Sequence, residues 1–114
     1  MKVVINTCFG GFGLSEKAWK RYAELAGFKL IKHPGMFGDE LYKDSVQEDN
    51  FLFHGDLSRT DPILIQVVEE LGADANDRFS DLKIVQIPDN IEWYICEYDG
   101  KESVHEHMYH VMLS

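Results

Sequence analysis

Residues 1–19, MKVVINTCFGGFGLSEKAW, place three glycines and two phenylalanines between a β-branched run and a run of helix formers. Residues 2–7 are predicted to form a short buried strand, because β-branched side chains suit a pleated, covered surface. Ser15 is a good N-cap, which predicts a helix over about 15–26. The intervening glycine loop, residues 8–14, either binds a ligand or only turns the chain.

The rest of the chain carries one further helix signal and several strand signals. Asp61 is a good N-cap and Pro62 suits the first helical position, so a second helix is predicted over about 61–71. Asp99-Gly100 is the pair that a tight hairpin turn needs, because both central residues adopt positive φ. Residues 34–47 show no firm pattern and are expected to form a loop. The remaining expected elements are strands at residues 28–33, 51–54, 82–87, 91–98 and 101–109 and a turn or helical piece at residues 73–80.

This order of elements predicts an α+β (mixed α/β) fold. We expect two main helices on a mixed sheet of four to six strands, with a C-terminal antiparallel β-hairpin. We also expect a single domain over residues 1–114, since a chain of 114 residues can bury a core without disulfide or metal staples.

Charge and composition exclude several classes of protein. The net charge is −9, from 20 acidic and 11 basic residues, and phosphate neutralisation supplies most non-specific nucleic-acid affinity, so no nucleic-acid partner is expected. The acidic charge indicates either a solvated surface or mimicry of DNA. No long apolar window or signal peptide is present, so no membrane partner is expected. Cys8 and Cys96 do not make a disulfide framework and are expected to be buried free thiols in a reducing cytoplasm.

A strand, glycines and a helix N-terminus in succession can form an anion site, since backbone N–H groups approach a phosphate where no Cβ intervenes. The spacing here, G-G-x-G, matches neither the dinucleotide fingerprint nor a P-loop. Phe9 and Phe12 are placed either to stack on a base or to pin a tight turn against the core. Both interpretations of the glycine loop remain open at this point.

Charged side chains outside the glycine loop offer further candidates. Arg59 could bind a phosphate or carboxylate through two parallel hydrogen bonds, or form a surface ion pair with Asp61 or a nearby Glu. Glu92, Glu97 and Glu102 could form a carboxylate pair across the predicted hairpin, which on an exposed face more often serves solubility than acid–base chemistry.

Histidine and cysteine give little support for a metal or a nucleophile. His105 and His107 would share one face of a strand, followed by His110, and could present imidazoles to a metal or simply titrate on an edge strand. Cys8 could act as a nucleophile if a histidine activated it, but no nucleophile signature surrounds it. No catalytic residue, metal or other cofactor is therefore expected.

Six segments of the chain are distinctive as a set: VINTCFGGFGLS at residues 4–15, RTDP at 59–62, VVEELG at 67–72, KIV at 83–85, IPDNIEW at 87–93 and EYDG at 97–100. Together they resemble a family of small proteins from tailed bacteriophages and prophages, to which no activity is attached. The resemblance covers most of the chain apart from residues 34–57 and the extreme C-terminus. Family members tend to end in a basic, Trp-containing tail, whereas this chain ends in HMYHVMLS.

The resemblance implies a function, because small acidic phage proteins often counter host defence, for example by sequestering a nucleotide-derived alarm molecule. It implies a protein of the host bacterial cytoplasm that binds a cyclic ADP-ribose-like molecule or a cyclic dinucleotide without catalysis, as a homo-oligomer where subunits share a pocket. Amides and a guanidinium would hold phosphates and rings would hold the base. The alternatives are a phosphoesterase acting on such a signal and an acidic inhibitor of a host protein. The residues expected at the ligand are Asn6, Thr7, Phe9, Gly10, Gly11, Phe12, Gly13, Arg59 and Trp93.

Overall fold

The computed structural model describes residues 1–36 and 38–106. These residues contain two α-helices, six strands and three short 3₁₀ helices. The predicted α+β class, the two main helices and the C-terminal hairpin are thereby confirmed. In chain order the elements are β1 (Lys2–Asn6), α1 (Glu16–Ala26), β2 (Leu30–Gly35), β3 (Gly38–Lys43), η1 (Glu48–Asn50), η2 (His54–Asp56), α2 (Pro62–Leu71), η3 (Gly72–Ala75), β4 (Leu82–Gln86), β5 (Trp93–Tyr98) and β6 (Lys101–Glu106).

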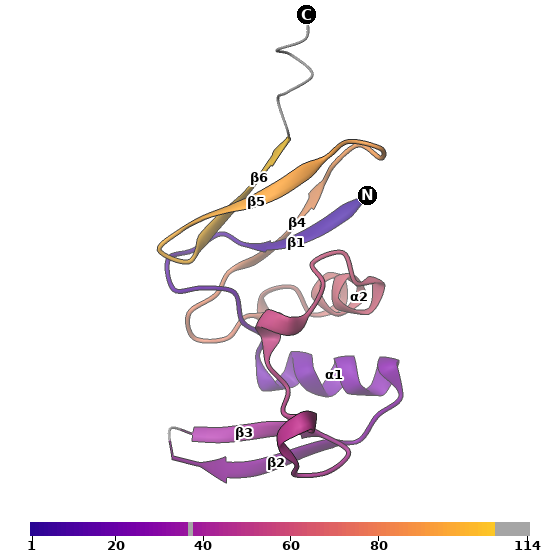
Figure 1. Ribbon diagram of the computed structural model, residues 1–114, viewed down its shortest axis with the longest axis vertical. Coiled ribbons are helices and arrows are strands. Elements are labelled where there is room, and N and C mark those ends of the chain that lie inside the picture. Colours follow the sequence, from indigo (N-terminus) through magenta and orange to yellow (C-terminus); the bar gives the residue numbers. More distant parts are fainter. Residues whose placement is uncertain (37, 107–114) are drawn as a thin grey trace, which may run out of the picture.

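The strands form three separate antiparallel pairs, β1–β4, β2–β3 and β5–β6, where the sequence predicted one mixed sheet. In Figure 1 the first and last pairs lie at one end of the molecule, the helices in the middle and β2–β3 at the opposite end. The β5–β6 hairpin contacts β1 but does not pair with it as a further strand. Two backbone N–H groups of β1 that such a strand would need have other partners. Val4 N donates to the carbonyl of Arg59 at 2.9 Å, and Asn6 N donates to Glu102 Oε1 at 2.8 Å.

Both helices begin at the N-caps that the sequence indicated. Ser15 Oγ accepts a hydrogen bond from Ala18 N at 3.1 Å, and Asp61 Oδ1 accepts one from Ile63 N at 2.9 Å. These bonds satisfy donors that a helix N-terminus leaves without an intrahelical partner. The second oxygen of Asp61 accepts from the Tyr22 hydroxyl at 2.5 Å, so the cap of α2 also joins the two helices.

The apolar residues of β1 are buried on both faces of the strand. One face contributes Val4 to the main core, which lies between the two helices and β1–β4. The other face contributes Val3 and Ile5 to a second cluster, on which Trp93 and Ile95 of β5 pack. The predicted alternation of β5 is confirmed, since these two side chains face inward. The main core consists of Val4, Phe12, Leu14, Ala18, Trp19, Leu64, Val67, Val68, Ala75 and Leu82.

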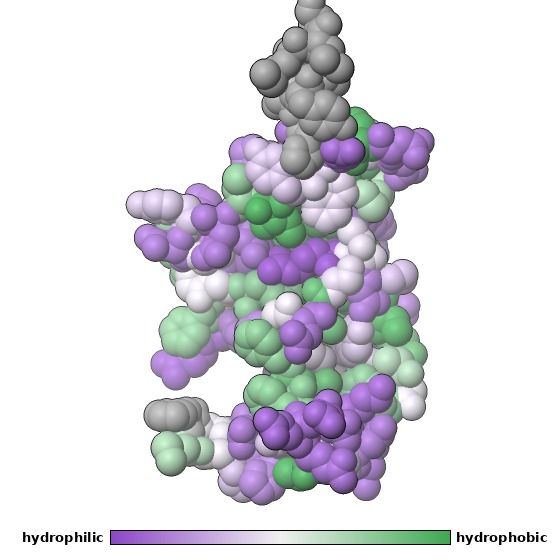
Figure 2. Space-filling view, viewed as in Figure 1, coloured by the Kyte–Doolittle hydropathy of each residue, from purple (hydrophilic) through white to green (hydrophobic). Residues whose placement is uncertain are grey.

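The region between β2 and α2 differs most from its prediction. Much of the expected loop at residues 34–47 belongs to a hairpin, in which β3 pairs with β2. The β3 sequence, GDELYK, contains no β-branched residue, so it carries little strand signal. The expected strand at residues 51–54 is reduced to a single bridge between Phe51 and Tyr42. Figure 2 shows that the surface is hollowed between this hairpin, at the bottom, and the body above it.

Both cysteines are free thiols. Cys96 is exposed, where a buried thiol was expected, because it lies on the outward face of β5. The expected extension of the last strand to residue 109, with His107 and His110, lies outside the described residues. Within residues 1–36 and 38–106, no helix has the length and apolar character needed to cross a membrane.

Candidate functional site

The glycine loop turns the chain from β1 toward α1 and also receives the turn of the β5–β6 hairpin. Gly10 N donates to the carbonyl of Asp99 at 3.1 Å. Gly100 lies so close that a Cβ added there would come within 2.7 Å of Gly10 N. The hairpin turn can approach the glycine loop in this way because Gly100 has no side chain, whereas a Cβ added at Gly10 would meet Phe79. The Gly10 amide, which an anion site would use, is therefore engaged within the protein.

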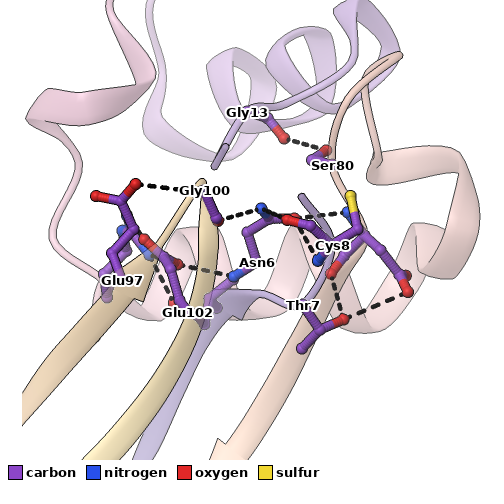
Figure 3. A network of polar contacts seen from close by, with 11 residues as sticks. Asn6, Thr7, Cys8, Gly13, Ser80, Glu97, Gly100 and Glu102 are labelled. Atoms are coloured by element: carbon purple, nitrogen blue, oxygen red, sulfur yellow. Dashed lines mark hydrogen bonds and ion pairs between the residues drawn. The ribbon is translucent and has the colours of Figure 1, made fainter. Parts of the chain in front are cut away.

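Asn6 is fully buried at the end of β1 and holds this junction together (Figure 3). Its Nδ2 donates to the carbonyls of Cys8 and Gly100, at 2.8 and 2.7 Å. Its Oδ1 accepts from Asp81 N at 2.8 Å, and its backbone N–H donates to Glu102 as described above. The side chain therefore joins the glycine loop to the hairpin turn and to the residue before β4.

The other side of the glycine loop is fastened to the segment that precedes β4 (Figure 3). Thr7 Oγ1 donates to the carbonyl of Asp81 at 2.9 Å, and Ser80 Oγ donates to the carbonyl of Gly13 at 2.8 Å. A Cβ added at Gly13 would meet the carboxylate of Asp77. Two residues of the predicted ligand set, Thr7 and Gly13, thus contact this segment.

Arg59 forms an ion pair with Glu102 that is largely buried, with side-chain exposures of 20% and 8%. Its two terminal nitrogens donate to the two carboxylate oxygens at 2.5 and 2.8 Å, and one of them also donates to the carbonyl of Val4 at 3.3 Å. The guanidinium lies 3.7 Å from the centre of the Phe12 ring, a cation–π arrangement. Of the two sequence interpretations, the ion pair is the one observed, with a partner in β6 and not on the surface.

A cavity of about 230 Å³, here called the aromatic cavity, opens beside this ion pair. The Phe53 ring on its wall is 50% exposed and lies 4.9 Å, centre to centre, from the His54 ring. From the predicted ligand set the cavity brings together Gly11, Phe12 and Arg59. The lining residues that the sequence did not indicate as ligand contacts include Phe53, His54 and Glu97.

Of these additional lining residues, only Glu97 was indicated by the sequence, as a member of a carboxylate pair. Glu97 and Glu102 lie directly opposite each other in the β5–β6 register, as the cross-hairpin carboxylate pair predicted. Like charges in that arrangement are unfavourable unless they are compensated. Arg59 compensates one of them, and Gly100 N donates to Glu97 Oε1 at 2.9 Å. Phe53 gave no such signal, because its segment was expected to be a strand.

Six residues of the predicted ligand set do not line the aromatic cavity: Asn6, Thr7, Gly10 and Gly13, which make the contacts described above, and the two aromatic residues Phe9 and Trp93. Phe9 is 62% exposed and meets Tyr98 edge to face, with ring centres 6.4 Å apart. Trp93 is half-buried and packs on the second hydrophobic cluster. Their rings are therefore not among those that line the cavity.

The cysteine and histidine named as candidate nucleophile and metal ligand bond to other partners. Cys8 Sγ is hydrogen-bonded to the carbonyl of Phe79 at 3.0 Å, and no hydrogen bond joins it to a histidine within the described residues. His105 instead lies 2.8 Å from Ser103 Oγ and stacks on Tyr94. The same part of the chain contains no group of three His, Cys, Asp or Glu side chains placed to hold a metal ion.

The chain matches no protein-family model, and comparison with curated proteins and with solved structures finds no significant match. The resemblance of the six sequence segments to phage proteins therefore stays a prediction.

Proposed function

We propose that this chain is a phage-encoded counter-defence protein that binds a nucleotide-derived host signal in the aromatic cavity and sequesters it without catalysis. The observation that carries the proposal is the meeting of Gly11, Phe12 and Arg59 with the exposed ring of Phe53 around one cavity. An exposed ring beside a few polar groups suits a flat heteroaromatic ligand such as a nucleobase. The phage origin and the host signal come from the resemblance.

The base end of the ligand, and not its phosphates, fits the cavity. Arg59 is already neutralised by Glu102, and the Gly10 amide is bonded to the hairpin turn. Glu97 adds a second negative charge to the lining, which repels a phosphate and accepts hydrogen bonds from base N–H groups. The expected pose therefore stacks the base on Phe53, directs its N–H edge toward Glu97 and leaves the phosphates on the solvent side.

Isothermal titration against cyclic ADP-ribose isomers, cyclic dinucleotides and ordinary nucleotides tests the proposal directly. We expect saturable heat with at least one of them and no competition from inorganic pyrophosphate, since the base provides the contact. A folded protein that gives no heat with the whole panel would contradict the proposal. Sedimentation with and without the bound compound then tests whether two or more subunits share the ligand.

A matched pair of aromatic substitutions locates the site. Phe53→Ala removes the exposed ring on the cavity wall, and Phe79→Ala removes a ring of similar exposure, 60%, that is not part of the cavity lining. Loss of one stacked base contact weakens binding by about 1–3 kcal/mol, so Phe53→Ala should lower affinity at least fivefold. Equal affinities for the two variants would place the ligand elsewhere.

Denaturing the complex and analysing the released compound separates sequestration from the phosphoesterase alternative. The unchanged compound supports sequestration, because an enzyme would have converted it during the incubation. A hydrolysed product would instead identify the chain as a phosphoesterase.

An acidic inhibitor of a host protein is a second candidate, and one observation favours it. Three exposed rings, Phe9, Phe79 and Tyr98, are 62%, 60% and 74% exposed on segments that meet at the glycine loop. Combined with a net charge of −9, these rings could contact a basic protein surface. This candidate predicts no small-molecule heat, and a host partner that is released at high salt and lost on Phe9→Ala.

A further inference from the structure

The aromatic cavity is lined by two carboxylates, those of Glu97 and Glu102, and only the first is open to a ligand. The β5–β6 register places the two opposite each other, on the face of the hairpin through which Ile95 packs on β1. Both oxygens of Glu102 accept hydrogen bonds from Arg59. Glu97 accepts a single bond, from Gly100 N to Oε1 at 2.9 Å (Figure 3). Within the described residues Glu97 forms no ion pair, and its Oε2 has no donor.

The open carboxylate of Glu97 discriminates between nucleobases by its hydrogen-bonding capacity. It presents two acceptor oxygens side by side and no donor, and Oε1 keeps a lone pair beside the bond from Gly100 N. Among the common bases, guanine alone has two adjacent donors on its Watson–Crick edge, the ring N–H and the amino N–H. Adenine and cytosine place an acceptor nitrogen beside the amino group, and uracil flanks its N–H with two carbonyl oxygens. In those three bases an acceptor lone pair would face a carboxylate oxygen, which is unfavourable.

We propose that the aromatic cavity selects guanine and that Glu97 determines this choice. The inference rests on the proposed nucleotide site and narrows its ligand to nucleotides that carry guanine. The guanine ring lies on Phe53, and its two adjacent N–H groups donate to the two oxygens of Glu97. These bonds also compensate the repulsion between Glu97 and Glu102, which face each other across the hairpin.

Three nucleoside monophosphates, GMP, IMP and AMP, test the choice of base, because they share the ribose and the phosphate. IMP lacks the amino donor of guanine, and AMP has an acceptor nitrogen where guanine has its ring N–H. The NMR shift of the Gly100 amide reports binding, since this N–H is bonded to Glu97. We expect GMP to bind with a dissociation constant on the order of 1 mM and IMP about fivefold more weakly. AMP should not saturate the shift at about 10 mM.

The outcomes separate this inference from the proposed function. AMP that binds as tightly as GMP would overturn guanine selection and leave the nucleotide site standing. The same conclusion would follow if GMP left the Gly100 amide unchanged at about 10 mM while another compound of the titration panel gave saturable heat. A folded protein that responds to no compound would contradict both.

Glu97→Gln tests whether this side chain makes the choice. The variant keeps the side-chain shape and an acceptor for Gly100 N, but it replaces one acceptor oxygen by an N–H₂ donor. An amide complements the donor and acceptor of adenine, so the variant should prefer AMP to GMP. Removing the charge also eases repulsion of the phosphate, but equally for all three nucleotides, so the preference is the readout.

Glu92→Gln is the matched control. It removes the same charge from an exposed residue just before β5 that does not line the cavity, and should leave the preference for GMP unchanged. A preference for GMP that survives Glu97→Gln, or that falls equally in both variants, would refute Glu97 as the determinant.

Discussion

The Arg59–Glu102 ion pair offers the sharpest test of how the hairpin is held. Arg59→Met keeps an apolar stem against Phe12 but removes two charge-assisted hydrogen bonds and the bond to the Val4 carbonyl. It leaves the Glu102 carboxylate, 8% exposed, with Asn6 N–H as its remaining hydrogen-bond donor. Breaking a buried pair by removing one partner costs about 3–5 kcal/mol, and because Arg59 is 20% exposed we expect about 3 kcal/mol.

A double-mutant cycle measures this coupling. Glu102→Gln keeps the shape of the side chain and an acceptor for Asn6 N–H, so the double variant buries no uncompensated charge. Urea unfolding, followed by circular dichroism, measures the free energy of unfolding of each variant. The double variant should lose about 2 kcal/mol less than the sum of the losses of the two single variants. Arg21→Met and Glu70→Gln form the control cycle, because that exposed pair should change stability little. Additive single effects, or equal losses for Arg59→Met and Arg21→Met, would refute the reasoning.

Further expectations concern the glycine loop and the helix junction. Asn6→Ala leaves buried carbonyl and N–H groups unpaired, so the free energy of unfolding should fall by about 2–4 kcal/mol in thermal unfolding. An unchanged melting temperature would contradict the role of Asn6 in linking these segments. Gly11→Ala should lower the free energy of unfolding only because its φ of 109° is unfavourable for alanine. Gly13→Ala should lower it because the new Cβ collides with Asp77, so adding Asp77→Ala should recover part of the loss. Urea unfolding of the three variants checks both expectations. Burial and the hydrogen bond to Asp61 raise the pKa of Tyr22 from 10.0 to about 12, so its contribution to stability is present below pH 10 and is lost as the pH rises through about 12. Absorbance titration should show one late-ionising tyrosine that is missing in Tyr22→Phe.

Local residue patterns are sufficient to predict the features of this fold that depend on neighbouring residues. The N-caps at Ser15 and Asp61, the turn at Asp99-Gly100 and the inward alternation of β5 follow from local hydrogen bonding, backbone conformation and side-chain periodicity. These interactions span at most a few positions, so the residue types are sufficient to predict them. The α+β class follows from the order of these elements.

Which segments meet, and therefore where the candidate site lies, depends on how the elements pack in three dimensions. Arg59 reaches a carboxylate 43 positions later, and Asn6 reaches a turn 94 positions away. Each side chain had several partners of suitable charge or polarity in the sequence, and only packing of the β5–β6 hairpin on β1 selected one. The same packing engages the Gly10 amide and brings Glu97, Gly100 and Glu102 to the aromatic cavity. Partner choice over such separations depends on the whole set of buried contacts, which no local pattern encodes.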